Sequence, residues 1–355
     1  MRSGRIAAGE YVAQFEQGLE RLLQQENIVT TSDMTSAILL ALKLSGVRAG
    51  DDVLTSPFAC MATNSAIAAL GARPVWVDMA KNAAHVDVAD FEAAITPNTR
   101  AAILYHLAGY PGPAAEIAAI CLERNIKLIE DCDNALLATI GDRTVGSFGD
   151  FAIYSFYPNR QINTTEGGAL TCRNVEHARK ARKLRRFGID PQNFRTANGE
   201  INGESDIPEV GFAATLNNVC SALGVAQLDT VSSRVEAART HATWLQSRLA
   251  GIPGVRVLAP MENSQPAYWT LLTLVENRDQ VLAKLKARGV QASKLHFRND
   301  RYSGFLNCAR PLPNTNVFQD NVIAMPCGWW LGAGDLDYLV DVIVDATNEC
   351  AYLID

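Results

Sequence analysis

The sequence predicts an α/β protein with a large, mainly parallel sheet and a smaller α+β region toward its C-terminal end. Between residues 35 and 175, strand-length hydrophobic segments alternate with helix-length apolar segments. This alternation is typical of a parallel sheet that helices cover on both faces. A polar loop rich in glycine and proline follows, and elements after residue 251 are shorter. We therefore predict a large domain over residues 1–229 and a small domain over residues 230–355.

The alternating region begins with an apolar, alanine-rich segment, Thr35–Leu44, which predicts a helix. Ser32 or Asp33 stands where a helix cap is expected. The next expected elements are a strand at 52–55, a helix at 60–70, a strand at 74–78, a helix at 90–94, a strand at 101–106, a helix at 114–124 and a strand at 127–131.

Two more strands, Phe151–Ser155 and Gly168–Cys172, complete the predicted sheet. Residues 176–208 predict a helix and then a long loop, and Asn217–Leu249 predicts a long helical stretch that is broken once. In the C-terminal region we expect strands at 255–258 and 269–275 and helices at 278–288 and 336–352.

Composition excludes several classes of function. The net charge of −6 argues against general nucleic-acid binding. The eight cysteines form no CxxC pair, which is typical of a reduced, cytoplasmic protein. No apolar run follows the N-terminus or approaches the roughly 20 residues of a membrane helix, so we expect neither a signal peptide nor a membrane span. Five dispersed histidines without an HExxH motif predict no catalytic metal.

Polar residues at the ends of predicted strands mark a candidate site. Asp131 and Ser155 each follow a hydrophobic strand, and ligands of parallel sheets bind at the carboxyl ends of the strands. A carboxylate at such a strand end, here Asp131, can hold a pyridinium nitrogen protonated, or it can simply cap a helix. Thr35 and Ser36 begin a helix whose free N–H groups can bind a phosphate, although an ordinary capped helix is the alternative.

The segment from Ser155 to Gly168, Ser-Phe-Tyr-Pro-Asn-Arg-Gln-Ile-Asn-Thr-Thr-Glu-Gly-Gly, resembles the cofactor-lysine signature of the DegT/DnrJ/StrS family of nucleotide-sugar aminotransferases. The resemblance extends over nearly the whole chain, including Gly71–Asp78 and Ile95–Ala101. It implies the type I aminotransferase fold, with a mainly parallel, seven-stranded type of sheet in the large domain, and a cofactor of pyridoxal phosphate or pyridoxamine phosphate.

The resemblance also implies roles for individual residues. Asp131 corresponds to the carboxylate at the cofactor's ring nitrogen. The cofactor-binding positions that it implies are Thr35, Ser36, Cys60, Asp131, Asn134 and Ser155. His296 and Arg298, in a Leu-His-Phe-Arg-Asn-Asp run, correspond to the sugar-nucleotide side, and this run is similar to the perosamine-synthase-like branch.

Arg160 stands at the position of the family's lysine. A lysine amine forms a Schiff base with pyridoxal phosphate and transfers protons, whereas a guanidinium stays protonated. Three functions follow from this substitution. The protein is an aminotransferase of a keto sugar nucleotide with a noncovalently held cofactor, a catalytically inactive relative that binds a sugar nucleotide, cofactor or partner, or a pyridoxamine-phosphate-dependent sugar dehydratase.

The resemblance further implies the partners of the protein. It predicts a cytoplasmic homodimer with active sites at the subunit interface, a sugar nucleotide and an amino-acid donor as ligands, and a role in cell-surface polysaccharide biosynthesis. The basic run at residues 179–186 is either a solvated helix face or lies near an anionic ligand.

Overall fold

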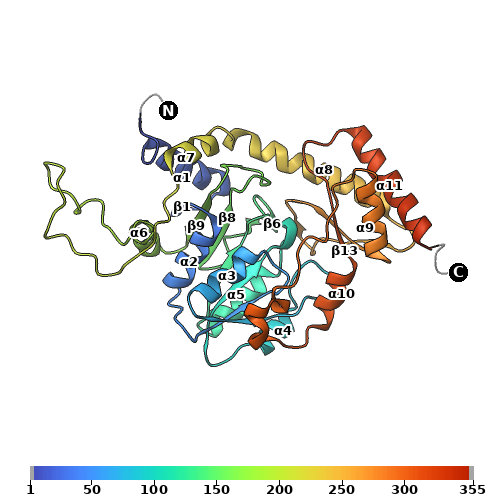
Figure 1. Ribbon diagram of the computed structural model, residues 1–355, viewed down its shortest axis with the longest axis horizontal. Helices are drawn as coiled ribbons and strands as arrows, with labels where there is room; N and C mark the ends of the chain where they lie inside the picture. Colours follow the sequence, from blue (N-terminus) through green and yellow to red (C-terminus); the bar gives the residue numbers. More distant parts are fainter. Residues whose placement is uncertain (1–3, 352–355) are drawn as a thin grey trace.

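A seven-stranded sheet lies at the centre of the computed structural model, which describes residues 4–351 (Figure 1). Five neighbouring strands run parallel, and only β9 runs against its two neighbours, β8 and β1. The mainly parallel sheet of the sequence prediction is therefore confirmed. In spatial order the strands are β1 (Ile28–Thr31), β9 (Gly168–Cys172), β8 (Phe151–Ser155), β5 (Lys127–Asp131), β4 (Thr99–Tyr105), β2 (Asp52–Thr55) and β3 (Arg73–Trp76).

Helices cover both faces of this sheet because successive side chains of each strand point to opposite faces. In β5, Ile129 packs into a hydrophobic cluster with α2 and α3, whereas Leu128 packs into another with α4 and α5. The helices of the large part are α1 (Glu10–Leu23), α2 (Met34–Leu44), α3 (Met61–Ala69), α4 (Val88–Ala93), α5 (Ala114–Glu123) and α6 (Val175–Leu184).

The predicted elements between residues 35 and 175 are confirmed to within about two residues. Sequence analysis missed α1 and β1. The signal for α1 was present, because Phe15, Leu19 and Leu23 recur every four residues and are all buried. β1 has only four residues, and all four are buried. The strand therefore lacks the alternation of apolar and polar residues that would have identified it.

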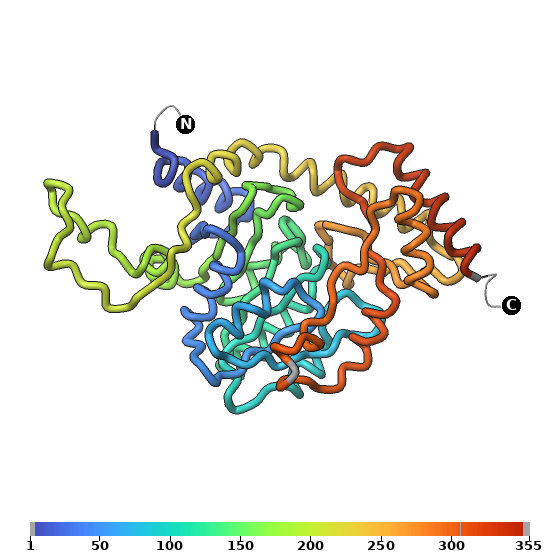
Figure 2. Tube along the Cα trace, in the orientation of Figure 1, coloured from blue at the N-terminus to red at the C-terminus, as the bar shows by residue number. Residues whose placement is uncertain are grey.

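The segment between α6 and α7 (Asn218–Val225) extends away from the body of the molecule as a long arm (Figure 2). After α7, a short 3-10 turn, Leu228–Thr230, leads into α8 (Val231–Leu249). This is the single break that the sequence predicts in the stretch 217–249. α8 then runs from the large sheet to the C-terminal part (Figure 1).

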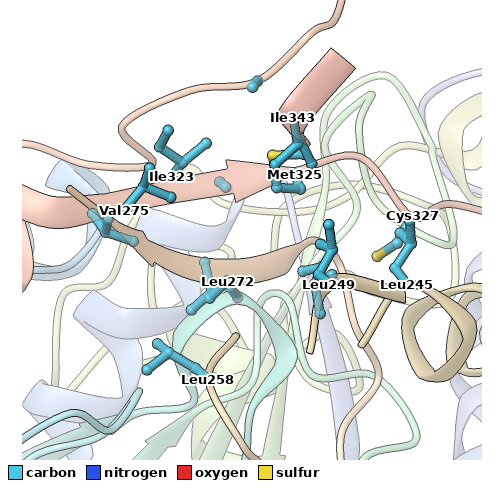
Figure 3. Close-up of a cluster of buried hydrophobic side chains, with 14 of the residues drawn as sticks. Leu245, Leu249, Leu258, Leu272, Val275, Ile323, Met325, Cys327 and Ile343 are labelled. Atoms are coloured by element: carbon cyan, nitrogen blue, oxygen red, sulfur yellow. The ribbon is translucent and has the colours of Figure 1, made fainter. Parts of the chain in front are cut away.

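The C-terminal part is built on a three-stranded antiparallel sheet in the order β10-β12-β13. Leucines of α8, including Leu245 and Leu249, pack against Leu272 of β12 and Ile343 of α11 (Figure 3). Its elements are β10 (Val255–Val257), β12 (Leu271–Val275), α9 (Arg278–Ala287), α10 (Pro313–Asn321), β13 (Val322–Met325) and α11 (Ala333–Ala351).

Sequence analysis identified β10, β12, α9 and α11 but missed α10 and β13. Its last predicted helical residue, Tyr352, lies outside the described residues. The domain division after residue 229 stays a prediction. Three short strands form a further sheet, β6 (Thr139–Ile140), β7 (Arg143–Thr144) and β11 (Ser264–Gln265), and further 3-10 turns occur at Leu107–Gly109, Asn299–Arg301 and Ser303–Cys308.

Within residues 4–351, no helix combines the length and apolar character that crossing a membrane requires.

Glu130, the penultimate residue of β5, holds the loop that precedes β8. Its buried carboxylate accepts hydrogen bonds from the backbone N–H groups of Gly146 (2.8 Å), Phe148 (2.7 Å) and Gly149 (2.6 Å). His106 accepts the Gly112 N–H at Nδ1 (3.0 Å), so its Nε2 carries the proton and donates to Glu130 (3.1 Å). His106, Glu130 and Cys132 each have one potential metal-ligand atom, and these three atoms lie within 4.8 Å of one another. Since the glutamate already accepts four hydrogen bonds, we assign this group a structural role.

Replacing Glu130 by alanine is expected to lower the free energy of unfolding by about 3 kcal/mol or more, because four buried donors lose their acceptor. Chemical denaturation measures the change. Glu123→Ala, on the exposed side of α5, is the matched control and should stay within about 0.5 kcal/mol of the wild type. Equal stability of the two variants would contradict the structural role of Glu130.

Candidate active site

The carboxyl ends of neighbouring parallel strands bring the candidate residues to one edge of the sheet. Tyr105 ends β4 and pairs with Asp131, which ends β5, and Asp131 pairs in turn with Ile153 of β8, two residues before Ser155. The predicted proximity of the Asp131 and Ser155 strand ends is therefore present in the structure.

Asp131 is fully buried, and it is held from two sides. The hydroxyl of Thr63, in the first turn of α3, donates to its Oδ2 (2.7 Å), and the backbone N–H of Asp133 donates to its Oδ1 (3.2 Å). Burial raises the pKa of Asp131 well above its ordinary value, and the nearby Asp133 carboxylate adds to the rise. A cationic partner at this carboxylate would relieve both effects.

Arg160 is committed to an ion pair inside the protein. Its Nη2 donates to Asp133 Oδ2 at 2.8 Å, and both side chains are buried. Burial lowers the pKa of Arg160, but the Asp133 carboxylate more than offsets this, so that the pKa is raised. The guanidinium is therefore a fixed cation that can hold an anionic or acceptor group but cannot accept a proton.

Trp269 and Asn159 complete the surroundings of this guanidinium. The guanidinium carbon lies 5.0 Å from the centre of the Trp269 ring, a cation–π arrangement. The indole N–H of Trp269 donates to the Asn159 carbonyl at 2.7 Å, and the Asn159 side chain accepts from Arg160 Nη1. The N–H at Arg160 Nε and Asp133 Oδ1 are buried without a partner among the described residues. Both atoms are thus available to a ligand.

A hydrogen-bonded chain links Asn134 to His296. Asn134 Nδ2 donates to the Tyr105 hydroxyl (2.8 Å), which lies 3.1 Å from His296 Nε2. Burial, together with the charge of Arg160, lowers the pKa of His296 to about 4. The imidazole is consequently neutral at pH 7, and its Nε2 shares a hydrogen bond with the Tyr105 hydroxyl. The structure thus brings two sequence-predicted residues, Asn134 and His296, into one network through a tyrosine that sequence analysis did not single out.

The N-terminus of α2 is capped by its own aspartate. Asp33 Oδ1 accepts the backbone N–H of Ser36 (2.8 Å), and its Oδ2 accepts the hydroxyls of Ser32 (2.7 Å) and Ser36 (2.8 Å). Met34 packs into the hydrophobic core under the sheet. A negatively charged group of the chain itself therefore lies where the helix dipole and the free N–H groups favour an anion.

Gly168 fixes the position of this helix start relative to Ser155. The two residues pair across β8 and β9. A Cβ atom on Gly168 would lie 2.6 Å from the carbonyl oxygen of Asp33 and 2.8 Å from the backbone nitrogen of Met34. Only glycine permits this approach, which sets Ser155, Thr35 and Ser36 at one end of the site.

The remaining predicted residues differ in their availability. Cys60 is the residue before α3, and burial raises the pKa of its half-buried thiol. Arg298 is 2% exposed, and its guanidinium donates to both carboxylate oxygens of Asp300 (2.9 and 2.5 Å) and to Asn316. These bonds hold the loop that carries His296, so a direct contact of Arg298 with a ligand stays a prediction.

Sequence reasoning did not assign roles to Asp133, Thr63, Tyr105 or Trp269. The sequence did indicate a role for Asp133, because it is a second carboxylate two residues after Asp131 in a chain that also carries Arg160. The contacts of Thr63 with Asp131 and of Trp269 with Arg160 could not have been found, because the partners lie far apart in the sequence.

The fold and the strand-edge site define a type I aminotransferase architecture. The chain belongs to the DegT/DnrJ/EryC1/StrS aminotransferase family, whose model matches residues 1–344. It is 31% identical to GDP-perosamine synthase from Caulobacter vibrioides over 293 residues, covering 81% of this chain and 76% of that protein. It is 26% identical to the spore coat polysaccharide biosynthesis protein SpsC from Bacillus subtilis, covering 97% and 92%. The crystal structure of the sugar aminotransferase CalS13 from Micromonospora echinospora superposes with a TM-score of 0.91 at 29% identity, covering 97% and 94%.

The cofactor of this family is pyridoxal phosphate or pyridoxamine phosphate. The ring end of such a cofactor fits the site, because Asp131 offers a buried carboxylate of raised pKa to a ring nitrogen. Arg160, whose segment resembles the cofactor-lysine signature, offers no amine to an aldehyde. At the phosphate end, Ser155 and the start of α2 are present, but the Asp33 carboxylate already takes the Ser36 amide. The residues thus fit a cofactor that is held without a covalent bond and whose phosphate competes with Asp33.

Asp133→Ala is expected to lower the free energy of unfolding by about 3–5 kcal/mol, because it leaves Arg160 buried without its counter-ion. The double variant Arg160→Met with Asp133→Ala should recover most of this loss, since no unpaired charge remains. Denaturant unfolding of the single and double variants gives the coupling energy. Glu92→Ala, which breaks the exposed pair with Arg124, is the control and should change stability by less than about 1 kcal/mol.

The contribution of His296 to stability should fall as the pH drops from about 6.5 toward about 4, because the unfolded chain then binds a proton at His296 that the folded chain excludes. The raised pKa values of the buried Asp131 and Asp133 contribute in the opposite direction, so the test compares variants and not the slope of the wild type alone. A histidine with a lowered folded-state pKa contributes in this direction only. His296→Gln should flatten this part of the profile, whereas His85→Gln, outside the network, should leave it unchanged. Melting temperatures of the variants measured across this pH range test the prediction. If the melting temperature of His296→Gln depends on pH as that of the wild type does, His296 does not contribute to the pH dependence.

Proposed function

We propose that this protein is an aminotransferase-type enzyme of nucleotide-sugar metabolism, which binds a keto sugar nucleotide next to a noncovalently held pyridoxamine or pyridoxal phosphate. The observation that carries the proposal is the buried Asp131 at the carboxyl end of β5, held by Thr63. Burying a carboxylate costs free energy, and a cationic ring bound beside Asp131 would offset this cost and so explain its burial. The similarity to GDP-perosamine synthase supports a sugar nucleotide as the substrate.

Within this proposal, the cofactor supplies an electron-withdrawing ring and, in its pyridoxamine form, the amine that is transferred. Asp131 keeps the ring nitrogen protonated, and Ser155, Thr35 and Ser36 bind the phosphate. Asn134 and Cys60 border the ring. Arg160 holds an acceptor group of the ligand through its unpartnered N–H at Nε.

Proton transfer requires a group other than Arg160. The neutral imidazole of His296 shares a hydrogen bond with the Tyr105 hydroxyl through Nε2. We assign the proton-accepting role on the sugar side to this pair, and to Arg298 the role of holding the loop of His296. This arrangement resembles general-base catalysis by a histidine in reach of the substrate.

The proposal also includes a cytoplasmic homodimer with active sites at the interface, an amino-acid donor, and a role in cell-surface polysaccharide biosynthesis. The free state of all eight cysteines supports the cytoplasmic location, and the similarity to SpsC supports the role in polysaccharide biosynthesis. The homodimer and the amino-acid donor rest on the resemblance to the family alone.

A second function is a catalytically inactive family member that binds a sugar nucleotide. Two observations favour it. The Asp33 carboxylate occupies the anion position at α2, and Asp133 pairs with Arg160, so each end of the site is neutralised by the chain itself.

Absorbance titration of the full-length protein with each cofactor separates the two functions. We expect saturable binding of pyridoxamine phosphate, a spectral change when a keto sugar nucleotide is added, and no visible band of lysine-bound pyridoxal phosphate. Arg160→Lys should gain this band only weakly, because Asp133 would hold the new ammonium protonated. Arg160→Lys with Asp133→Ala should gain it strongly, and Arg160→Gln is the control without an amine.

Failure of either cofactor to bind at high concentration would contradict the enzymatic proposal and leave the inactive relative. Asp33→Ser then reports the reason. If this variant gains cofactor binding, the Asp33 carboxylate excludes the phosphate. If Asp33→Ser does not gain cofactor binding, the Asp33 carboxylate is not the reason why the pocket fails to bind the cofactor.

A further inference from the structure

Two consecutive residues at the start of α3 hold partners in two parts of the molecule. Thr63 donates its hydroxyl to Asp131 Oδ2 at 2.7 Å, whereas Asn64 Nδ2 donates to Asn299 Oδ1, also at 2.7 Å. Asn299 lies in the C-terminal part, 235 positions further along the chain and three residues after His296. The first turn of α3 therefore contacts both Asp131 and the loop that carries His296.

The Asn64 amide is buried, and both of its N–H groups are used within the chain. Besides Asn299, Nδ2 donates to the Ser56 carbonyl (3.0 Å), and Oδ1 accepts the hydroxyl of Thr55 at the end of β2 (2.8 Å). Because a carbonyl oxygen can only accept, the contact with Ser56 identifies the nitrogen end of the amide. The direction of the bond to Asn299 is thus fixed by its surroundings.

Asn299 in turn holds the segment that precedes α3. Its backbone N–H donates to the Pro57 carbonyl (2.8 Å), and its Nδ2 donates to the carbonyls of Ala59 (3.2 Å) and Phe297 (3.2 Å). The residue is 2% exposed, so these bonds are shielded from water. Together with the bond from Asn64, they fasten the His296 loop to residues 57–59.

The His296 ring contacts the segment that Asn299 holds. Phe58 stands between the two carbonyls that accept from Asn299, and its ring meets the imidazole edge-on, with ring centroids 5.8 Å apart. The Tyr105 hydroxyl lies 3.1 Å from His296 Nε2. Asn299 therefore sets the position of the imidazole relative to one of its two aromatic neighbours directly.

These contacts form a closed circuit, because Tyr105 of β4 pairs with Asp131 of β5. In order, its members are Asp131, Thr63, Asn64, Asn299, His296 and Tyr105. A closed circuit has no free end, so His296 cannot move relative to Asp131 unless a buried hydrogen bond breaks.

The attachment of this segment to the large sheet does not depend on Asn299 alone. The Thr315 hydroxyl donates to Asp78 (2.6 Å), and Arg310 Nη1 donates to Asp90 (3.2 Å). Among these three anchors, only Asn299 contacts the segment at Phe58. A purely structural need for an anchor is thus met elsewhere.

We propose that Asn299, held by Asn64, is a positioning residue that fixes His296 relative to Asp131. Every side-chain N–H of the two amides donates within the chain, so both residues act through the groups that they hold and not by touching a ligand. This inference rests on the proposed function, in which Asp131 faces the cofactor ring and His296 accepts a proton. It adds the residues that set the separation of these two groups.

The test is an NMR titration of the five histidine side chains in the full-length protein, without cofactor. Burial and the charge of Arg160 lower the pKa of His296 to about 4, so the wild-type imidazole should stay neutral between about pH 7.5 and about pH 5.5. Asn299→Ala and Asn64→Ala should each raise this pKa toward about 6.5, because water then reaches the ring. The double variant should raise it no further than the larger single effect, since the two amides form one link.

Two controls separate positioning from stability. Thr315→Ala removes a buried anchor of the same segment, so it should lower the melting temperature and leave the pKa of His296 unchanged. Asn321→Ala removes an amide that donates to the Val317 carbonyl within α10, and it should change neither quantity.

The inference is overturned if Asn299→Ala lowers the melting temperature while His296 stays neutral over this pH range, because Asn299 is then only structural. Additive effects of the two asparagine substitutions would overturn it as well. If Asn299→Ala does not fold, Asn64→Ala, which removes one side of the link, decides between the same outcomes. None of these titrations requires a cofactor, so failure of both cofactors to bind would contradict the proposed function and leave this test intact.

Discussion

The buried ion pair between Arg160 and Asp133 is the interaction on which the character of this site depends. A guanidinium without a counter-ion could not be accommodated at 9% exposure, because desolvating a charge costs several kcal/mol. The Asp133 carboxylate offsets this desolvation cost. Because Asp133 is only two residues from Asp131, two carboxylates and one cation lie close together in a buried space. Burial and the proximity of the carboxylates raise the pKa of Asp131. The pair thus sets both the charge of the pocket and the state of its neighbours.

The parallel sheet makes this arrangement possible. Because β4, β5 and β8 end at one edge, Tyr105 and Asp131 pair directly and Ser155 follows on the adjacent strand. The helices α2 and α3 then direct their N-termini toward the same edge, where Asp33 and Thr63 contribute. The C-terminal part closes the site with the His296 loop and with Trp269. Every wall of the pocket therefore comes from a different element, and none of them can be moved without changing the others.

The charges of the pocket show a consistent pattern. Arg160 pairs with Asp133, and the Asp33 carboxylate caps α2. Each of these charged groups therefore has a partner within the chain. Several buried atoms have no hydrogen-bond partner among the described residues, among them Arg160 Nε, Asp133 Oδ1 and Asn134 Oδ1, and these are the atoms that a ligand held by hydrogen bonds would use.

The sequence by itself determined the fold, the sheet edge of the site and the identity of several of its residues. Hydrophobic periodicity is a local property, and Asp131 and Ser155 could be placed because they end periodic segments, whereas Arg160 was singled out by the resemblance of its segment to a family signature. Only the tertiary structure decided what these residues contact. The ion pair of Arg160 with Asp133 joins residues 27 positions apart, and the contact of Tyr105 with His296 joins residues 191 positions apart. No local pattern encodes such distances, because they result from how strands are ordered in the sheet and how α8 carries the C-terminal part back onto it.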